Sequence, residues 1–346
     1  MKMKKYIFIL GLMCSLLTAC YGDYTMDYEY TGVYSAYQYD LRSFVIGEGA
    51  KFDFTVALAG IVNNDEDREI KVQIEDELVT GDLSEIYPEA GVAEFTALDG
   101  LKGQGKFGLL SQSYVSKAFA GVSEIRPLPS SYYIVEGIDD MVIRKGRHTA
   151  AVTIKATEEM FTDEKAFGAY YAIGFRILEA EADVVVKDRS FEIIGVKCEN
   201  RFYGNWYHGG KTVIKNDSTG EIISTSEYEL TVPQAESKLY TLTTLNANTV
   251  RTNKMEGREG YLLLEFNGND ISISCDDPSV ILNPIQGYPS RFNDAPLLQD
   301  RRLSINYSFS NGDGTTTYVY DNLLFRNRIR DGINEWQDEN TENYDK

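Results

Sequence analysis

The sequence has 346 residues, with 34 Lys and Arg against 53 Asp and Glu, and a formal net charge of −19 at pH 7. A field of this sign repels phosphate backbones and anionic headgroups, which argues against a nucleic-acid partner. At 43% hydrophobic residues the chain is too apolar for a disordered protein, and it is long enough for two domains of ordinary size.

Residues 1–19 have the order of a lipoprotein signal peptide. Lys2, Lys4 and Lys5 precede an apolar run at 6–17, and small residues lead to Cys20. This run is shorter than the ~20 residues needed to span a bilayer. We therefore expect a mature protein that begins at lipidated Cys20 and is anchored to a membrane by the lipid. An ordinary secretory signal with a chance cysteine is the alternative.

Residues 20–30 are expected to form an acidic tether. Asp23, Asp27 and Glu29 follow the cysteine closely. This arrangement resembles the surface-export signal of Bacteroidota lipoproteins, which implies the outer membrane and a location facing the cell exterior. A solvated, flexible tether explains the same residues, and both interpretations can hold together.

The first half of the mature chain alternates apolar and polar residues with period two. The pattern is clear at 52–58, 70–74, 150–154 and 171–177, and it is typical of half-buried strands. We expect a β-sandwich over residues 31–180, ending at the charged stretch 179–188.

Residues 189–336 are also rich in strand-like segments. The turns at 267–270 and 311–314 contain Asn, Gly and Asp, which favour tight hairpins. Up-and-down strands of this kind can close into a small barrel. Residues 337–346 are expected to form a polar tail.

Residues 87–127 interrupt the strand pattern. This segment is rich in glycine and alternates little, so we expect a long insertion in the sandwich. Within it, residues 103–108 fit a GxGxxG string and 100–106 the start of a P-loop. Phe107 stands where a magnesium-binding Ser or Thr is needed, so a flexible loop is the better interpretation.

Several segments resemble known domains. Residues 52–60, 63–68, 128–133 and 143–146 resemble a Bacteroidota domain family of unknown function with an immunoglobulin-like β-sandwich. That family is common in surface lipoproteins of polysaccharide-utilisation loci and also occurs ahead of family-18 glycoside hydrolase domains. Gly174 departs from it, because a proline is expected there.

The second half is similar to the frequent C-terminal companion of that family, a lipocalin-like β-barrel. Residues 203–210, 242–244 and 324–329 carry this resemblance. The two resemblances together imply a surface lipoprotein of a glycan-utilisation locus that binds carbohydrate. They imply no particular sugar.

Cys198 and Cys275 are the cysteines that remain once Cys14 leaves with the signal and Cys20 is lipidated. They can form one disulfide in an oxidising compartment or stay as two separate buried thiols.

Catalytic and metal-binding patterns are weak. His148 and His208 are the only histidines, and neither has a neighbour at ligand spacing. The DxxDxDxE motif of family-18 hydrolases is absent, and the acidic stretch 65–67 lacks the spacing of a calcium loop. We expect no enzyme activity, no cofactor and no metal.

Aromatic residues near strand ends and loops are the best binding candidates. Sugar rings pack their C–H faces on aromatic planes, while their hydroxyls need polar partners nearby. Filling the core of a sandwich or barrel is the alternative role for each of them. The candidate ligand-binding residues are Trp206, Tyr207, His208, Tyr288, Arg291 and Trp336.

The sequence thus predicts an all-β surface lipoprotein with two domains that binds glycans without catalysis, next to an outer-membrane import complex. A structural or adhesin-like lipoprotein, such as a fimbrial or surface-complex subunit, is the main alternative. A barrel that encloses a small hydrophobic ligand is a third possibility.

Overall fold

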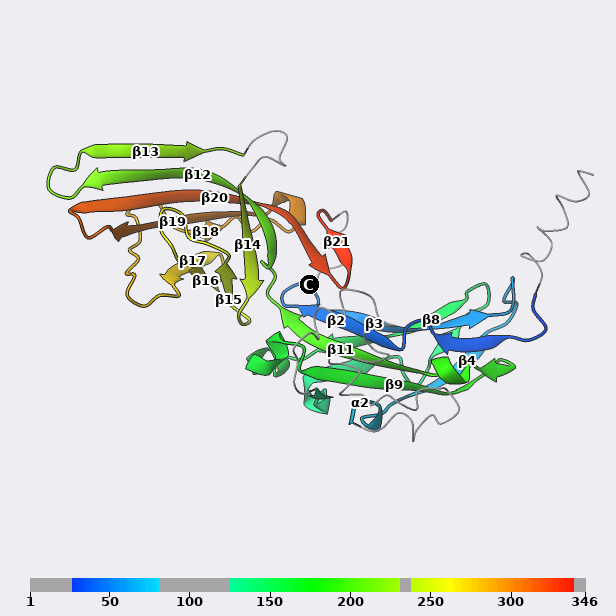
Figure 1. Cartoon of the computed structure of the whole chain (residues 1–346). Helices are drawn as coiled ribbons and strands as arrows, with labels where there is room; N and C mark the ends of the chain where they lie inside the picture. The colour runs from blue at the N-terminus through cyan, green and yellow to red at the C-terminus, as the bar shows by residue number, and fades with distance from the viewer. Residues whose placement is uncertain (1–26, 81–124, 231–237, 339–346) are drawn as a thin grey trace, which may run out of the picture.

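The structure, a computed structural model, describes residues 27–80, 125–230 and 238–338. The expected signal peptide, Cys20, nearly all of the 87–127 insertion and residues 339–346 lie outside these ranges. The described chain is almost entirely β, which confirms the predicted fold class (Figure 1). Among the described residues, no helix is long and apolar enough to cross a membrane.

Residues up to Glu199 form a sandwich of two sheets. The first sheet has the order β10 (Val184–Val185), β1 (Gly32–Ser35), β3 (Lys51–Ala59), β8 (Thr149–Ala156) and β6 (Tyr133–Glu136). The second has the order β2 (Tyr39–Val45), β11 (Phe191–Glu199), β9 (Tyr171–Ala180), β4 (Arg68–Ile74) and β7 (Val142–Ile143), and β5 (Arg126–Pro127) pairs with β9. The short helical elements are α2 (Glu77–Thr80), η1 (Ser130–Tyr132), η2 (Met160–Thr162), η3 (Glu164–Phe167) and η4 (Lys187–Arg189).

The sandwich core follows the predicted alternation. Along β3, every second residue from Phe52 to Leu58 is buried. Phe54 stacks on Phe175 of β9, with ring centroids 4.4 Å apart. The structure also explains why residue 174 is a glycine and not the proline expected from the resemblance. An added Cβ there would lie 2.6 Å from the carbonyl oxygen of Glu75. Glycine at this position therefore allows the segment that leads into α2 to close on β9.

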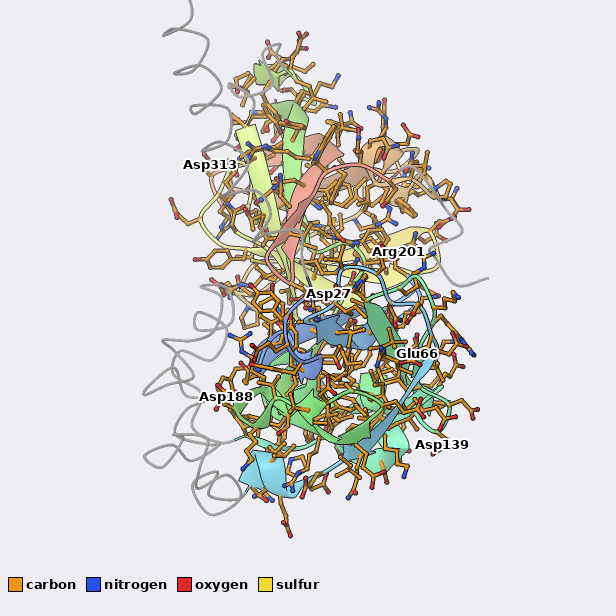
Figure 2. All side chains as sticks on the ribbon, turned by 90° about the vertical axis from the view of Figure 1, so that its right-hand side faces the viewer. Asp27, Glu66, Asp139, Asp188, Arg201 and Asp313 are labelled. Atoms are coloured by element: carbon orange, nitrogen blue, oxygen red, sulfur yellow. The ribbon has the colours of Figure 1, made fainter. Side chains whose placement is uncertain are left out.

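The expected start of the second domain at residue 189 needs a correction. β11 pairs in parallel with β2 over seven residues and antiparallel with β9, so Phe191–Glu199 belongs to the sandwich. The chain changes sheets at Asn200–Tyr203, and Arg201 lies between the two sheet systems in Figure 2. Alternation alone does not show which sheet a strand joins, and this explains the difference.

The second domain is a closed barrel. Its strands follow the order β12 (Gly204–Asn216), β14 (Lys238–Thr244), β15 (Thr249–Thr252), β16 (Leu262–Asn267), β17 (Asp270–Cys275), β18 (Arg291–Phe292), β19 (Arg302–Ser310) and β20 (Thr315–Arg330), and η6 (Leu298–Asp300) lies between β18 and β19. Antiparallel pairing of β20 with β12 closes the ring. β13 (Ile222–Tyr228) extends the sheet from β12, and β21 (Ile333–Glu335) pairs with the end of β20.

Large side chains fill the barrel interior. Trp206, Tyr240, Tyr307 and Phe309 are all at most 2% exposed and belong to one apolar cluster. This packing argues against the alternative in which the barrel encloses a small hydrophobic ligand.

The two cysteines are separate. Cys198 is buried in the sandwich core on β11, whereas Cys275 is partly exposed at the end of β17 in the barrel. Both thiols are free, so the structure favours the alternative of two unpaired cysteines.

Candidate functional site

A groove of about 1030 Å³ crosses the outer surface of the barrel. Residues of β13, β12, β20, β19 and β18 line it, together with the loop that precedes β18. Successive strands of this set are paired, and β13, β12 and β20 lie together at the upper left of Figure 1.

The groove floor is a regular array of outward-facing side chains. Tyr320 of β20 is opposite Lys211 of β12 on one side and Asn306 of β19 on the other. Two residues further along β20, on the same face of the strand, Asn322 is opposite Ser304. Intervening residues of β20, such as Asp321, point into the barrel, so one strand serves both the core and the groove.

Two glycines open the middle of the floor. Gly210 has a φ of 142°, and an added Cβ would lie 2.1 Å from the carbonyl oxygen of Tyr320. Glycine is therefore required where β12 approaches β20. A Cβ on Gly209 would lie 3.2 Å from Leu230, so a side chain there would also press on the groove lining.

The loop before β18 forms one wall, and backbone pairing fixes it to β19. Asn283 and Ser308 exchange two backbone hydrogen bonds of 2.8 Å. The backbone N–H of Asn306 donates to the Ser290 hydroxyl at 2.8 Å. This loop holds Tyr288, which is 55% exposed, with its ring centroid 4.9 Å from that of Tyr320 and the planes at 70°. The groove therefore presents aromatic surface at a fixed position.

Charged side chains line both sides of the groove. Glu227 and Glu229 lie on or directly after β13, whereas Arg291 and Arg302 belong to β18 and β19. Lys211 stands between them on the floor, with its Nζ 5.5 Å from the ring centroid of Tyr320. Negative charge thus lies on the β13 side of the groove, and positive charge lies on the floor and on the side of β18 and β19.

The structure brings two of the six predicted ligand-binding residues together. Tyr288 and Arg291 both line the groove. Tyr207 faces the same outer side of the sheet, opposite Leu324, and the guanidinium of Arg326 lies 5.7 Å from its ring centroid. Trp336 is 55% exposed but follows β21 and is not among the residues that line the groove.

Trp206 and His208 are corrections to the prediction, because both side chains are fully buried. The Trp206 indole donates from Nε1 to the carbonyl oxygen of Phe202 at 3.0 Å and packs edge-on against Phe325. On β12, even-numbered residues in this stretch point into the barrel. Neither ring is available to a ligand at the surface.

His208 belongs to a buried polar cluster under the groove. Its Nε2 lies 3.0 Å from Asp321 and its ring stacks on Tyr240, with centroids 4.1 Å apart. Tyr228 donates its hydroxyl to the same carboxylate at 2.5 Å. Burial and then the Asp321 carboxylate raise the pKa of Tyr228, so this phenol stays a hydrogen-bond donor. The cluster holds the inner faces of β12, β13 and β20 together.

The sequence analysis missed several groove residues, namely Lys211, Arg302, Tyr320 and Asn322. The strand-like character of this part of the chain was visible in the sequence, but it does not reveal which side chains of β20 point outward, because Val319 and Asp321 face the core while Tyr320 and Asn322 line the groove. Among the residues described in the three ranges, no cluster of His, Cys, Asp or Glu is arranged to hold a metal ion.

No protein-family model matches the sequence, and a search of curated proteins finds no match. A solved structure of a Bacteroides ovatus protein of unknown function is similar with a TM-score of 0.59 and 18% sequence identity, covering 90% of this chain and 99% of that one. This likeness shows a shared fold. An auxiliary nutrient binding protein of Bacteroides thetaiotaomicron has a TM-score of 0.38 and 14% identity, covering 86% of this chain and 96% of that one.

Proposed function

We propose that the protein binds a glycan in the outer groove of the barrel without chemical conversion. The observation that carries this proposal is the Tyr288–Tyr320 pair beside polar side chains in an open groove. A sugar ring can pack on the exposed tyrosine face while its hydroxyls bond to Asn306, Asn322 and Ser304.

The proposal places the protein on the outer membrane, facing the cell exterior, through a lipid on Cys20. The order of charge, apolar run and cysteine in residues 1–20 supports this location. An import complex in the same membrane is the proposed partner. Many copies confined to one surface would strengthen individually weak contacts with a polymeric glycan.

The test is affinity-gel retention of purified residues 21–346 on a broad polysaccharide panel. We expect retention on at least one polymer, lost in Tyr288→Ala and kept in Trp336→Ala. Trp336 is a matched control because it is an aromatic side chain with the same 55% exposure, outside the groove. If the folded protein is retained on no polysaccharide of the panel, or if both variants lose retention equally, the proposal is wrong.

One observation favours the structural or adhesin-like alternative. β13 lies at the edge of its sheet, and its Ile222 and Ile223 side chains are 57% and 56% exposed. Edge strands with exposed apolar residues can pair with another chain. A ladder of SDS-resistant oligomers from cells, abolished by Ile223→Lys, would favour this function.

A further inference from the structure

We infer that the groove takes an acidic glycan, whose sugars carry carboxylate or sulfate groups. This inference rests on the proposed function and adds the chemical class of the ligand. It follows from the cationic side chains of the groove, from the contacts that they leave open, and from the position of the groove's acids.

The groove is cationic relative to the rest of the molecule. Acidic residues outnumber basic ones by 19 in the whole chain, yet Lys211, Arg291 and Arg302 meet only Glu227 and Glu229 in the lining. The lining therefore has one more basic than acidic residue in a chain whose net charge is −19, which favours an anionic ligand at this place.

The basic groups are largely free to bind. Within the described ranges, neither a hydrogen bond nor an ion pair engages the Arg302 guanidinium or the Lys211 ammonium group. Arg291 uses its Nε for a 2.7 Å contact with Asp270, and this leaves its terminal nitrogens for other partners. A guanidinium binds a carboxylate or a sulfate through two parallel hydrogen bonds, so Arg302 is the principal anion-binding residue of the proposed site.

The acids on the opposite side give the ligand a direction. Glu227 and Glu229 accept hydrogen bonds from sugar hydroxyls but repel a sugar carboxylate or sulfate. The favoured pose thus has the anionic groups toward β18 and β19, hydroxyls toward β13, and a ring face on Tyr288. The same repulsion disfavours the reversed pose.

The test compares matched charged and neutral polymers by calorimetry with residues 21–346. Polygalacturonate and its carboxyl-reduced form examine carboxylates, and carrageenan and its desulfated form examine sulfates. We expect one charged polymer to bind at least about tenfold more tightly than its neutral form, with the advantage falling as salt rises. The pair that shows this difference identifies the anionic group.

Two arginine variants locate the effect. Arg302→Gln is expected to lower affinity for the charged polymer about tenfold or more, because a charge-assisted hydrogen bond is lost. Arg144→Gln is the matched control, since it removes one positive charge from the sandwich, where Arg144 is 68% exposed and pairs with Asp67. Lys211→Gln is a second groove variant, and thermal melting verifies that each protein is folded.

Equal affinity for charged and neutral forms would overturn the acidic-glycan inference and leave glycan binding in the groove intact. Equal losses in Arg302→Gln and Arg144→Gln would also overturn it, because attraction would then come from general charge. Absence of binding to these polymers and to the whole polysaccharide panel would overturn the proposed function itself.

Discussion

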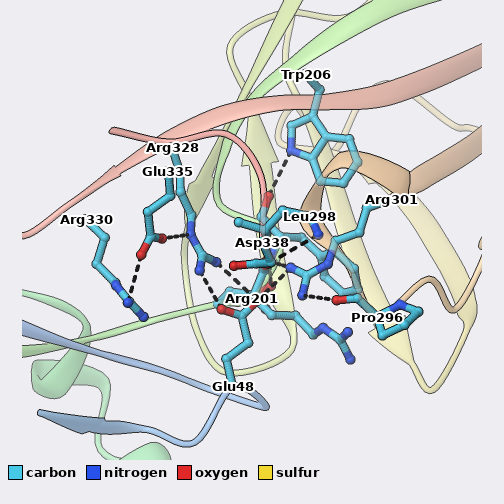
Figure 3. A network of polar contacts seen from close by, with 12 residues as sticks. Glu48, Arg201, Trp206, Pro296, Leu298, Arg301, Arg328, Arg330, Glu335 and Asp338 are labelled. Atoms are coloured by element: carbon cyan, nitrogen blue, oxygen red, sulfur yellow. Dashed lines mark hydrogen bonds and ion pairs between the residues drawn. The ribbon is translucent and has the colours of Figure 1, made fainter. Parts of the chain in front are cut away.

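The carboxylate of Glu48, in the turn between β2 and β3 of the sandwich, lies 2.5 Å from Nη2 of Arg328 in the barrel (Figure 3). Its other oxygen accepts a 2.6 Å hydrogen bond from Arg301. All three side chains are almost fully buried. Burial raises the pKa of Glu48, but Arg328 and Arg301 outweigh it, so the net pKa is lowered and the group stays anionic.

Glu48→Gln should destabilise the protein strongly, because it leaves two buried guanidinium groups without their shared anion. Breaking a buried ion pair in this way costs about 3–5 kcal/mol. Urea unfolding measures the loss. Glu66→Gln is the control, since Glu66 pairs with Arg68 at 2.8 Å but is 62% exposed, and its loss should cost less than about 1 kcal/mol. Similar losses in both variants would contradict the prediction.

Glu192 on β11 should make stability depend on pH. Burial raises its pKa from 4.5 to about 8, and the Ser35 hydroxyl donates to it at 2.5 Å. The folded state keeps a proton that the unfolded chain releases above pH 4.5. The stabilisation is therefore complete below pH 4.5 and is lost as pH rises to about 8, by up to about 1.4 kcal/mol per pH unit.

Glu192→Gln tests this contribution, because glutamine stays neutral. The difference in unfolding free energy between variant and wild type should move in favour of the variant from about pH 5 to pH 8. Urea midpoints at several pH values provide the measurement. A difference that is constant over this range would show that Glu192 does not titrate as expected.

The two tryptophans should behave very differently. Trp206→Ala removes a fully buried indole and its hydrogen bond to Phe202, which should cost about 3–5 kcal/mol of unfolding free energy. Trp336→Ala should change stability by no more than about 0.5 kcal/mol. Equal melting temperatures would refute the burial of Trp206. Any loss of glycan retention in Trp206→Ala must therefore be judged against the fraction of folded protein.

The thiols should react in two phases in residues 21–346, which lack Cys14 and Cys20. Cys275 is partly exposed and should react with a thiol reagent in native buffer. Cys198 is buried, and burial raises the pKa of its thiol to about 12, so it should react only on unfolding. Cys275→Ser should remove the fast phase. A protein whose thiols both appear only after reduction would instead contain a disulfide.

Much of the fold could be predicted because local chemistry decides it. The alternation at Phe52–Leu58 matches β3, and the turn at Gly268, with a φ of 60°, joins β16 to β17 as expected. Gly312 and Gly314 likewise take positive φ in the second predicted turn. In each case the strand or turn is determined by a few residues that are neighbours in the sequence.

The site was less predictable because it depends on which face of each strand points outward. Tyr207 and His208 are adjacent on β12, yet one faces the solvent side and the other the core. Tyr288 and Tyr320 are distant in sequence and meet only because the loop before β18 is fixed against β19. The joining of β11 to β2 is equally non-local, and it set the domain boundary that alternation misplaced.

The groove floor presents its outward side chains at a fixed spacing, and this spacing restricts which ligands fit. Its outward side chains repeat every ~4.8 Å across the strands and every ~6.8 Å along them, because strand spacing and rise are fixed. Val319 and Asp321, between the outward residues of β20, are locked in the barrel core. The distances between the outward side chains cannot change unless the core opens, so the floor is a rigid surface. A glycan polymer bound as proposed would need a repeat that matches these spacings along the groove.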